Sequence, residues 1–358
     1  MRILFAVSHL SVGGAERVVS ILSSEFVKRG HEVGVVAVQG DERFYETKAS
    51  VSYFPIVVTH TKILAWPMRV KKLRRIFLQY QPDLIISFLD GVSTKSLLAN
   101  HFPKRKIILS ERNDPNRNEM SRTPLKQLRN FLFAKADAVV FQTKDAMQYF
   151  PEPIRAKGRI IYNPITTMLP TSDRELLRKC VVGIGRLEAQ KNWPLLLNAF
   201  EKFVDEFPEY TLELYGKGTL EQALRERVES SDLIREKVIF RGFVKDVHKQ
   251  IADSAMFVLP SDFEGLSNAM IEAMALGIPT ICTDCPIGGA KEIIDDGENG
   301  LLVPVGDEEA LLAAMRKIAS DTALAQKLSA NALKIKEMLN VEKIVKQWNV
   351  LINEVASM

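Results

Sequence analysis

A short apolar run, Met256 to Leu259, is followed by a glycine, Gly265, and then by a segment in which apolar residues recur with helical spacing. The apolar run predicts a buried strand, and the glycine allows the backbone to turn tightly after it. Either Ser267 or Asn268 can cap the helix that follows. A strand, a turn and a helix in this order form a βα unit, and such units build parallel sheets covered by helices. This segment therefore constrains the fold more than any other part of the chain.

The same turn carries one carboxylate, Glu264, and a second carboxylate, Glu272, follows eight residues later. The first N–H groups of the helix lack partners within the helix, and the helix dipole favours an anion such as a phosphate in front of them. A carboxylate beside a phosphate would repel it, so its natural partner is a hydroxyl-rich group attached to a phosphate. The pattern favours a sugar nucleotide. The alternative is an ordinary crossover whose two glutamates are solvated or capping.

A second motif lies upstream, where the apolar strand Val181 to Ile184 runs into the Gly185 turn. Arg186 follows at once, and Lys191 comes five positions after the arginine. Two cations on a loop at the carboxyl end of a strand suit a diphosphate leaving group, because they stabilise the negative charge that develops as the sugar bond breaks. A surface loop with solvated charges is the alternative, and the presence of both motifs weakens it.

Two further glycine pairs stand before helical segments. Gly13 and Gly14 follow the N-terminal strand Ile3 to Val7, and Gly288 and Gly289 permit close approach of the backbone to a ligand. The spacing around Gly13 does not give G-x-G-x-x-G, so a dinucleotide-dependent oxidoreductase gains little support.

With these motifs assembled, the chain resembles the retaining glycosyltransferases of the GT-B fold, family 4, over nearly its whole length. The motifs that carry the resemblance are GGAER from Gly13, YNP from Tyr162, GRLEAQK from Gly185, LYGKG from Leu214, the pair Glu264 and Glu272, and PIGGAKEI from Pro286. The resemblance implies an α/β fold of two Rossmann-like, doubly wound parallel-sheet domains facing a central cleft.

Position by position, the resemblance implies that Arg186 and Lys191 hold the donor diphosphate. It also implies that Glu264 contacts the donor sugar and that Glu272 contacts the ribose of the nucleotide. The expected catalytic residues are Arg186, Lys191 and Glu264, and the expected donor-binding residues are Gly13, Gly14, Gly185, Gly265, Leu266, Ser267 and Glu272. The family reaction needs no metal and no cofactor beyond the nucleotide-sugar, and the sequence agrees in having no Asp-x-Asp pair.

The chain departs from the family at one position. Many members carry a histidine that faces the donor sugar in a Ser-Glu-His setting, whereas here Ser110-Glu111 is followed by Arg112. Both His9 and Arg112 are candidates for that wall of the cleft. The alternatives are a loop histidine with its own partner for His9, and a salt bridge with Glu111 or Asp114 for Arg112.

At 358 residues the chain exceeds the size at which one core keeps growing, so we expect two domains. The predicted N-terminal, acceptor-binding domain spans residues 1–165, and the predicted nucleotide-sugar-binding domain spans residues 170–340. Prolines and threonines interrupt the periodicity near Asn163 to Ser172, which predicts the linker. An amphipathic helix at about 341–358 ends the chain, and the resemblance implies that it packs back on the first domain.

Charge is unevenly distributed along the chain. Residues 1–165 carry 26 Lys and Arg against 14 Asp and Glu, while the remainder carries 22 against 30. Much of the excess lies on a predicted amphipathic helix, Pro67 to Gln79, whose basic residues are Arg69, Lys71, Lys72, Arg74 and Arg75. A second basic segment contains Arg117, Arg122, Lys126 and Arg129.

Such patches, together with Arg112, predict contact with an anionic membrane surface or a phosphate-bearing acceptor. A solvated helix face is the alternative for each. No aromatic stacking series accompanies the charge, which argues against nucleic acid as a partner. The sequence has no run of 18 apolar residues and begins directly with a strand, so we expect a cytoplasmic protein, peripheral at the inner face of the membrane. Its cysteines, Cys180, Cys282 and Cys285, are expected to be plain thiols.

The sequence and the resemblance together predict a glycosyltransferase. The predicted reaction moves a hexose or N-acetylhexosamine from a nucleotide-sugar, UDP-linked, to a lipid-linked or oligosaccharide acceptor with retention of configuration, in cell-surface polysaccharide or glycan assembly. A nucleotide-sugar epimerase or hydrolase on a GT-B-like fold is the alternative, and it would need a dedicated acid/base pair. A non-catalytic lipid-binding module is disfavoured because the donor-site residues look complete.

Overall fold

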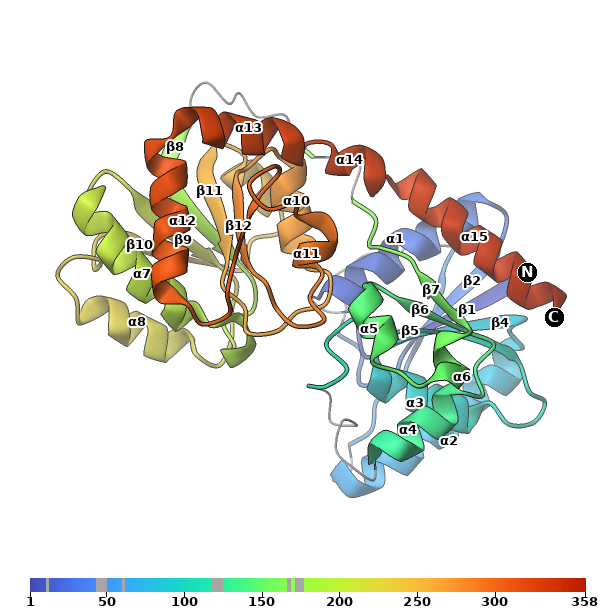
Figure 1. Cartoon of the computed structure of the whole chain (residues 1–358). Coiled ribbons are helices and arrows are strands. Elements are labelled where there is room, and N and C mark those ends of the chain that lie inside the picture. Colours follow the sequence, from blue (N-terminus) through green and yellow to red (C-terminus); the bar gives the residue numbers. More distant parts are fainter. Residues whose placement is uncertain (11–12, 43–49, 60–61, 118–124, 166–168, 171–176) are drawn as a thin grey trace. The chain divides into compact units, whose positions relative to one another are not determined.

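The computed structural model describes the whole chain except residues 11–12, 43–49, 60–61, 118–124, 166–168 and 171–176. The chain divides into two compact units (Figure 1). Unit 1 comprises Met1–Pro164 and Val341–Met358, and unit 2 comprises Ile165–Asn340. The first division thus falls between Pro164 and Ile165, and part of the predicted linker lies outside the described residues.

The described residues of unit 1 form a seven-stranded parallel sheet in the order β3-β2-β1-β4-β5-β6-β7. The strands are β1 (Arg2–Val7), β2 (Glu32–Ala37), β3 (Ser52–Pro55), β4 (Leu84–Phe88), β5 (Lys106–Ser110), β6 (Ala138–Phe141) and β7 (Gly158–Ile160). Strands β1, β4 and β6 are almost wholly apolar because helices cover both faces of the sheet.

The helices of unit 1 are α1 (Gly14–Lys28), α2 (Lys62–Tyr80), α3 (Asp90–Ala99), α4 (Leu125–Phe133), α5 (Lys144–Gln148), α6 (Glu152–Arg155) and α15 (Val341–Ser357). Helices α1 and α15 cover one face of the sheet, and α2, α3 and α4 cover the other (Figure 1). The order of the strands reverses between β1 and β4. The loops after these two strands therefore diverge at a switch point, which is where open α/β sheets bind ligands.

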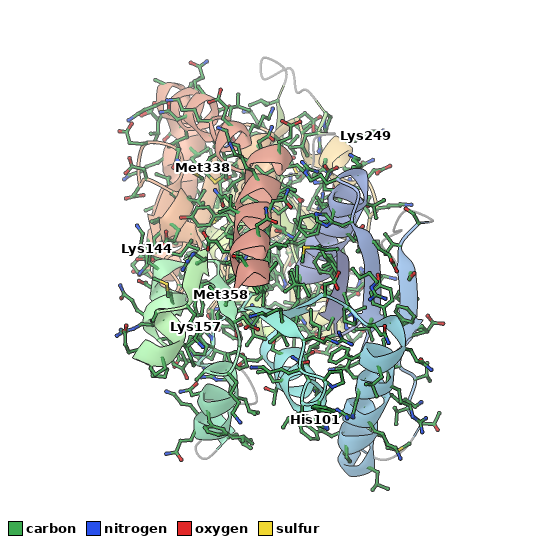
Figure 2. The ribbon with its side chains drawn as sticks, turned by 90° about the vertical axis from the view of Figure 1, so that its right-hand side faces the viewer. His101, Lys144, Lys157, Lys249, Met338 and Met358 are labelled. Atoms are coloured by element: carbon green, nitrogen blue, oxygen red, sulfur yellow. The ribbon has the colours of Figure 1, made fainter. Side chains whose placement is uncertain are left out.

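The C-terminal helix α15 belongs to unit 1 although unit 2 precedes it in the chain. It ends at Ser357, one residue before Met358, which is labelled in Figure 2. Trp348 on its inner face is fully buried, and its ring stacks on Phe88 at the end of β4 with 6.2 Å between centroids. The other buried residues of the helix are Val341, Ile344, Val345, Leu351, Ile352 and Val355. This apolar stripe at helical spacing is what holds the last helix to the first sheet.

The described residues of unit 2 form a six-stranded parallel sheet in the order β10-β9-β8-β11-β12-β13. The strands are β8 (Arg178–Ile184), β9 (Thr211–Tyr215), β10 (Val238–Gly242), β11 (Ser254–Leu259), β12 (Thr280–Thr283) and β13 (Leu301–Val303). The strand order again reverses at one point, here between β8 and β11.

The helices of unit 2 are the 3₁₀ helix η2 (Ala189–Lys191), α7 (Trp193–Glu206), α8 (Glu221–Glu229), α9 (Val247–Ile251), α10 (Asn268–Ala275), α11 (Ala290–Ile293), α12 (Glu308–Ser320), α13 (Thr322–Ala332) and α14 (Ile335–Met338). Trp193, Phe200 and Phe203 of α7 are fully buried and form the centre of the core with α12 and the sheet. This core fixes the strands whose ends carry the predicted site.

The predicted fold class, two Rossmann-like parallel-sheet domains, is confirmed. The predicted basic helix starts earlier than expected, at Lys62 instead of Pro67. Proline cannot donate the N–H bond of an interior helical position, which is why the sequence favoured a start there. The additional turn buries Ala65. None of the helices in the described ranges combines the length and apolarity that a membrane crossing requires.

Replacing Trp348 by Ala tests the packing of α15. We expect Trp348→Ala to lower the free energy of unfolding by about 3–5 kcal/mol, because it removes a fully buried ring and leaves a cavity against Phe88. Urea unfolding followed by circular dichroism measures this. Val350→Ala on the exposed side of the same helix is the control, and equal effects of the two substitutions would contradict the packing.

Candidate active site

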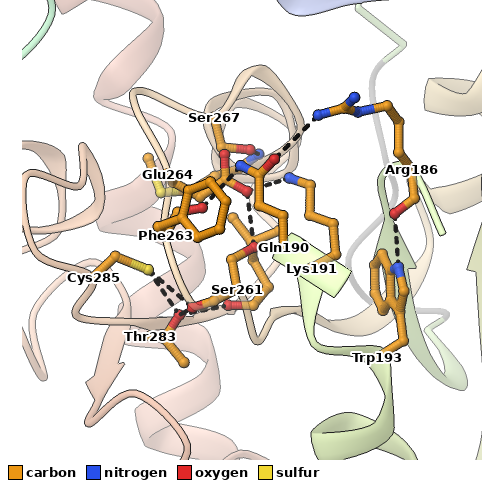
Figure 3. A network of polar contacts seen from close by, with 12 residues as sticks. Arg186, Gln190, Lys191, Trp193, Ser261, Phe263, Glu264, Ser267, Thr283 and Cys285 are labelled. Atoms are coloured by element: carbon orange, nitrogen blue, oxygen red, sulfur yellow. Dashed lines mark hydrogen bonds and ion pairs between the residues drawn. The ribbon is translucent and has the colours of Figure 1, made fainter. Parts of the chain in front are cut away.

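The predicted site residues of unit 2 lie on loops that leave neighbouring strands at the switch point. Strands β8 and β11 pair directly, with Val181 opposite Met256 and Val182 opposite Phe257. The strands are parallel, so their carboxyl ends meet at the same edge of the sheet. The loop from Gly185 to Lys191 and the turn from Ser261 to Ser267 therefore lie side by side, as Figure 3 shows.

Lys191 and Glu264 meet in an ion pair at this edge. The Lys191 Nζ donates to Glu264 Oε1, and Ser261 Oγ donates to the same oxygen at 2.8 Å. The two charged side chains are only 11% and 14% exposed. Since water screens this pair less than a pair on the open surface, its electrostatic coupling is stronger. Two residues 73 positions apart in the sequence are thus brought into direct contact.

Arg186 lies beside this pair and is held by the same loops. Its Nη2 donates to Gln190 Oε1 at 3.1 Å, and Gln190 Nε2 donates to the carbonyl of Phe263 at 2.9 Å. Trp193 Nε1 donates to the Arg186 carbonyl at 2.9 Å. The Arg186 side chain itself is exposed. The backbone is therefore fixed while the guanidinium stands at the open edge of the sheet.

Two glycines make the close packing of these loops possible. A Cβ at Gly185 would lie 2.9 Å from Lys191 Cε, so the glycine leaves room for the lysine stem. Gly216 has a φ of +138°, and a Cβ there would lie 1.9 Å from the Gly185 carbonyl oxygen. The loop after β9 can therefore press on the loop after β8, which gives the predicted LYGKG motif a structural reason.

The turn before α10 is held by a cap and by a second turn. Ser267 Oγ accepts a hydrogen bond from Met270 N at 3.4 Å, so Ser267 and not Asn268 caps the helix. Gly289 N donates to the Gly265 carbonyl at 2.9 Å, and a Cβ at Gly289 would lie 2.6 Å from Leu266 Cα. The chain bends at Gly265 between β11 and α10, as expected, without a left-handed backbone at this glycine.

The cysteines of unit 2 are free and buried. Cys285 Sγ donates to the Ser261 carbonyl at 2.9 Å, and burial raises the pKa of Cys285 to about 12, so the thiol stays protonated. A cavity of about 10 Å³, roughly the room of one water molecule, lies between Cys285, Glu264 and Ser267. A nucleotide-sized ligand needs several hundred Å³, so this cavity is too small to hold one.

The second predicted carboxylate, Glu272, lies on α10. Its Oε2 is 2.8 Å from Nε2 of His248 on α9. Sequence reasoning missed His248, because a histidine without ligand spacing shows no pattern. Among the described residues, no group of three or more His, Cys, Asp and Glu has the arrangement of a metal site.

The other predicted donor-binding residues, Gly13 and Gly14, lie in unit 1 at the start of α1. A Cβ at Gly13 would lie 2.1 Å from Glu16 Oε2, so the glycine makes room for this buried side chain. Glu16 Oε1 is in turn 3.6 Å from His9 Nδ1. His9 thus has a nearby partner of its own on α1.

Arg112 is buried, which removes it from the predicted membrane-facing surface. Its guanidinium carbon lies 4.6 Å from the centre of the Phe88 ring and 5.9 Å from that of Trp348. Nε donates to Ser110 Oγ at 2.7 Å, and Nη1 donates to Asn163 Oδ1. Burial lowers the pKa of Arg112 to about 9. The arginine connects β5 to the C-terminal helix and to the end of the first chain segment of unit 1.

A pair of acidic side chains lies beside Arg112 at the ends of β4 and β5. Asp90 accepts a hydrogen bond from Arg129 Nη1 at 3.0 Å, and Arg129 is fully buried. Arg129 is therefore not part of an exposed basic patch, contrary to prediction. Burial and the nearby Asp90 raise the pKa of Glu111 well above its ordinary value. The charged form of this carboxyl is therefore disfavoured in the folded chain.

The basic residues of α2 differ in their surroundings. Lys71 and Arg75 are exposed, whereas Lys72 Nζ donates to the Val57 carbonyl at 2.6 Å. Arg74 Nη2 donates to the Phe102 carbonyl at 3.0 Å, and Arg69 has its Nε buried. Of the second basic segment, Arg117 is exposed and Lys126 is partly buried, while Arg122 lies outside the described residues.

Two family models match this chain. Glycosyltransferase Family 4 matches residues 12–168, and Glycosyl transferases group 1 matches residues 178–321. A Campylobacter jejuni enzyme named N-acetylgalactosamine-N,N'-diacetylbacillosaminyl-diphospho-undecaprenol 4-alpha-N-acetylgalactosaminyltransferase is 29% identical, over 88% of this chain and 89% of its own. A second Campylobacter jejuni α-1,4-N-acetyl-D-galactosaminyltransferase, named for a diNAcBac-PP-undecaprenol glycan, is 28% identical over 99% of both chains.

Solved structures share the fold at lower identity. Sucrose-phosphate synthase from Thermosynechococcus elongatus superposes with a TM-score of 0.84, 20% identity and 99% of both chains covered. Anabaena HepE, solved in complex with UDP and glucose, superposes with a TM-score of 0.82 and 19% identity, over 98% of this chain and 99% of that chain.

The two sheets, the paired charges at the switch point of unit 2 and these matches together define a glycosyltransferase of the GT-B fold. More narrowly, the chain belongs to glycosyltransferase family 4, with a group 1 glycosyltransferase domain in unit 2.

Glu111→Gln tests the raised pKa of the Glu111 carboxyl in unit 1. A raised pKa in the folded chain means that, as the pH rises above about 4.5, the unfolded chain loses its proton first and stability falls until the folded pKa is passed. Glutamine keeps the shape and the hydrogen bonds of the protonated acid without titrating. We therefore expect Glu111→Gln to remove this decline and to be more stable than the unsubstituted protein at the upper end of the range.

Urea unfolding at a series of pH values measures the effect, and the exposed Glu337→Gln is the control. A wild-type stability that rises over the same pH range while Glu111→Gln remains flat would show that the carboxyl is ionised in the folded protein.

Proposed function

We propose that this glycosyltransferase moves a hexose or N-acetylhexosamine from a UDP-linked donor to a lipid-linked glycan, with retention of configuration. Such transfer belongs to the assembly of cell-surface polysaccharides or glycans. The observation that carries the proposal is the contact of Lys191 with Glu264 beside Arg186, at the switch point of the unit 2 sheet. Unit 2 accordingly binds the nucleotide-sugar, and unit 1 binds the acceptor.

The charges at this edge suit a leaving diphosphate. Lys191 is shared between Glu264 and an incoming anion, so a bound diphosphate would draw the ammonium toward itself and release Glu264 to the hydroxyls of the sugar. Arg186, exposed at the same edge, offers a planar donor for a second phosphate oxygen. Two cations then take the role that a divalent ion has in other transferases, so the reaction needs no metal and no further cofactor.

Retention requires the new bond to form on the face from which the old bond departs. In the proposed step the bond between the anomeric carbon and the diphosphate oxygen breaks, and a bond to the acceptor oxygen forms on the same face. The acceptor proton passes to the departing diphosphate oxygen. Glu264 is held by Lys191 and Ser261, which suits it to orient the sugar instead of attacking it.

The lipid-linked acceptor is supported by the relatives and by the surface of unit 1. Both Campylobacter jejuni relatives are named for undecaprenyl-linked substrates. Exposed apolar side chains accompany the exposed cations of α2, and others lie on α4. They are Leu64, Trp66, Leu78, Leu125, Leu128 and Phe131. Apolar side chains next to exposed cations are typical of proteins that rest on an anionic membrane surface. We therefore propose peripheral contact with such a membrane from the cytoplasmic side.

The test is an assay of several UDP-sugars against short polyprenyl-diphosphate glycans, with the added mass read by mass spectrometry. A sugar-sized mass increase that depends on both substrates is expected. Donor consumption without any acceptor would favour the nucleotide-sugar epimerase or hydrolase instead. A product with an inverted anomeric configuration, identified by NMR, would contradict retention.

Removal of either cation should slow the chemical step. We expect Lys191→Ala and Arg186→Ala each to lower kcat by about 100-fold, because each stabilises charge that develops on the leaving group. Single-turnover kinetics measure this. Lys179→Ala, which removes a surface lysine of the same unit, is the control and should leave kcat unchanged. Near-normal turnover of both site variants would show that the two cations do not stabilise charge on the leaving group.

Membrane contact should depend on the exposed cations of α2. We expect Lys71→Gln combined with Arg75→Gln to weaken binding to anionic vesicles by about 30-fold, at about 1 kcal/mol for each cation. Vesicle co-sedimentation measures this. Lys317→Gln with Lys336→Gln changes the charge of unit 2 by the same amount and is the control. Equal binding of the two double variants would rule out α2 as the contact surface.

A further inference from the structure

His248 and Glu272 form a sheltered contact next to the proposed donor site. The Nε2 of His248 lies 2.8 Å from Oε2 of Glu272. The two side chains are 13% and 9% exposed. A carboxylate only accepts hydrogen bonds, so the histidine donates from Nε2. Competition from water is small at this exposure, and the contact restrains the glutamate more than a surface contact would.

The two residues come from elements that begin at the same edge of the sheet. Helix α9 leads from β10 into β11, and α10 follows β11, so both helices start at the carboxyl ends of the strands. His248 is near the start of α9, and Glu272 lies on the buried side of α10. Lys249, the neighbour of His248, is exposed at the surface of unit 2 and is labelled in Figure 2. The histidine therefore points inward while the next residue points outward.

We propose that His248 positions the Glu272 carboxylate for the ribose hydroxyls of the nucleotide. The inference rests on the proposed function, in which Glu272 contacts the ribose. A free glutamate side chain has three rotatable bonds, and ordering them on binding reduces affinity. His248 holds one carboxylate oxygen in advance, so the orientation of the carboxylate is set before the ligand binds. His248 is a positioning residue, since it acts through Glu272 and not on the reacting atoms.

This role predicts an effect on donor binding and not on the chemical step. Loss of the histidine donor should raise KM for the donor and weaken UDP binding by about 5- to 10-fold, the size of one typical hydrogen bond. The kcat should change less than about 2-fold, because the contact is the same before and during bond breaking. A side chain that only supported the fold would lower stability and activity together.

The experiment measures binding of UDP, 2′-deoxy-UDP and 3′-deoxy-UDP by calorimetry. The variants are His248→Phe, which keeps a ring without a donor, His248→Gln, which can donate from a similar place, and Glu272→Ala. The unsubstituted protein should lose affinity when the contacted hydroxyl is removed. His248→Phe should bind UDP more weakly than the unsubstituted protein. Its affinity should fall little further with the deoxy ligand, because the substitution and the missing hydroxyl remove the same interaction. His248→Gln should recover most of the UDP affinity.

The outcomes separate this inference from the proposed function. No UDP binding by the unsubstituted protein would overturn the proposed function. If Glu272→Ala still loses affinity when a ribose hydroxyl of UDP is removed, the role of Glu272 is overturned. If His248→Phe binds UDP with unchanged affinity, the role of His248 alone is overturned. The same conclusion follows if the loss of binding free energy caused by His248→Phe and the loss caused by the deoxy ligand are additive. His101→Phe in unit 1 is the control, and thermal melting of each variant reports on folding.

Discussion

The contact between Lys191 and Glu264 depends on a topological constraint, the reversal of strand order between β8 and β11. Because the strands are parallel neighbours, the loops that follow them leave the sheet side by side at one edge. A cation on one loop and a carboxylate on the other can then meet with little exposure to water. The glycines of both loops, the Ser267 cap and the Gly289 turn all maintain this one approach. The proposed donor site is the open edge above it.

In unit 1, buried charged side chains connect distant segments of the fold. Arg112 and Arg129 are enclosed by aromatic rings and by Asp90, and they connect β4, β5 and α15. A buried charge is stable only with partners, so each guanidinium fixes several segments at once. Where many family members carry a histidine, this chain carries Arg112, which packs on Trp348 of the C-terminal helix. The substitution thus links the edge of the unit 1 sheet to the last helix of the chain.

Much of the unit 2 site could be predicted from its sequence because its residues are local to two motifs. A strand followed by Gly185, Arg186 and Lys191 places the cations at a strand end whatever the rest of the chain does. The same holds for Glu264 after β11. His248 could not be found in this way, because its contact with Glu272 joins two helices that no sequence spacing relates. The burial of Arg129 escaped prediction for the same reason, since its partner Asp90 is 39 residues away.

The sequence by itself determined the alternation of strands and helices, the two-domain organisation and the residue types at the strand ends, because periodicity and turn chemistry act over a few neighbouring residues. Only the tertiary structure decided which charges are sheltered and which remain open to solvent. In the sequence, Lys71 and Arg129 are both basic residues on amphipathic helices. In the structure Lys71 is exposed, whereas Arg129 is fully buried. The difference arises from packing between distant segments, which sets the local dielectric and the partners of each charge.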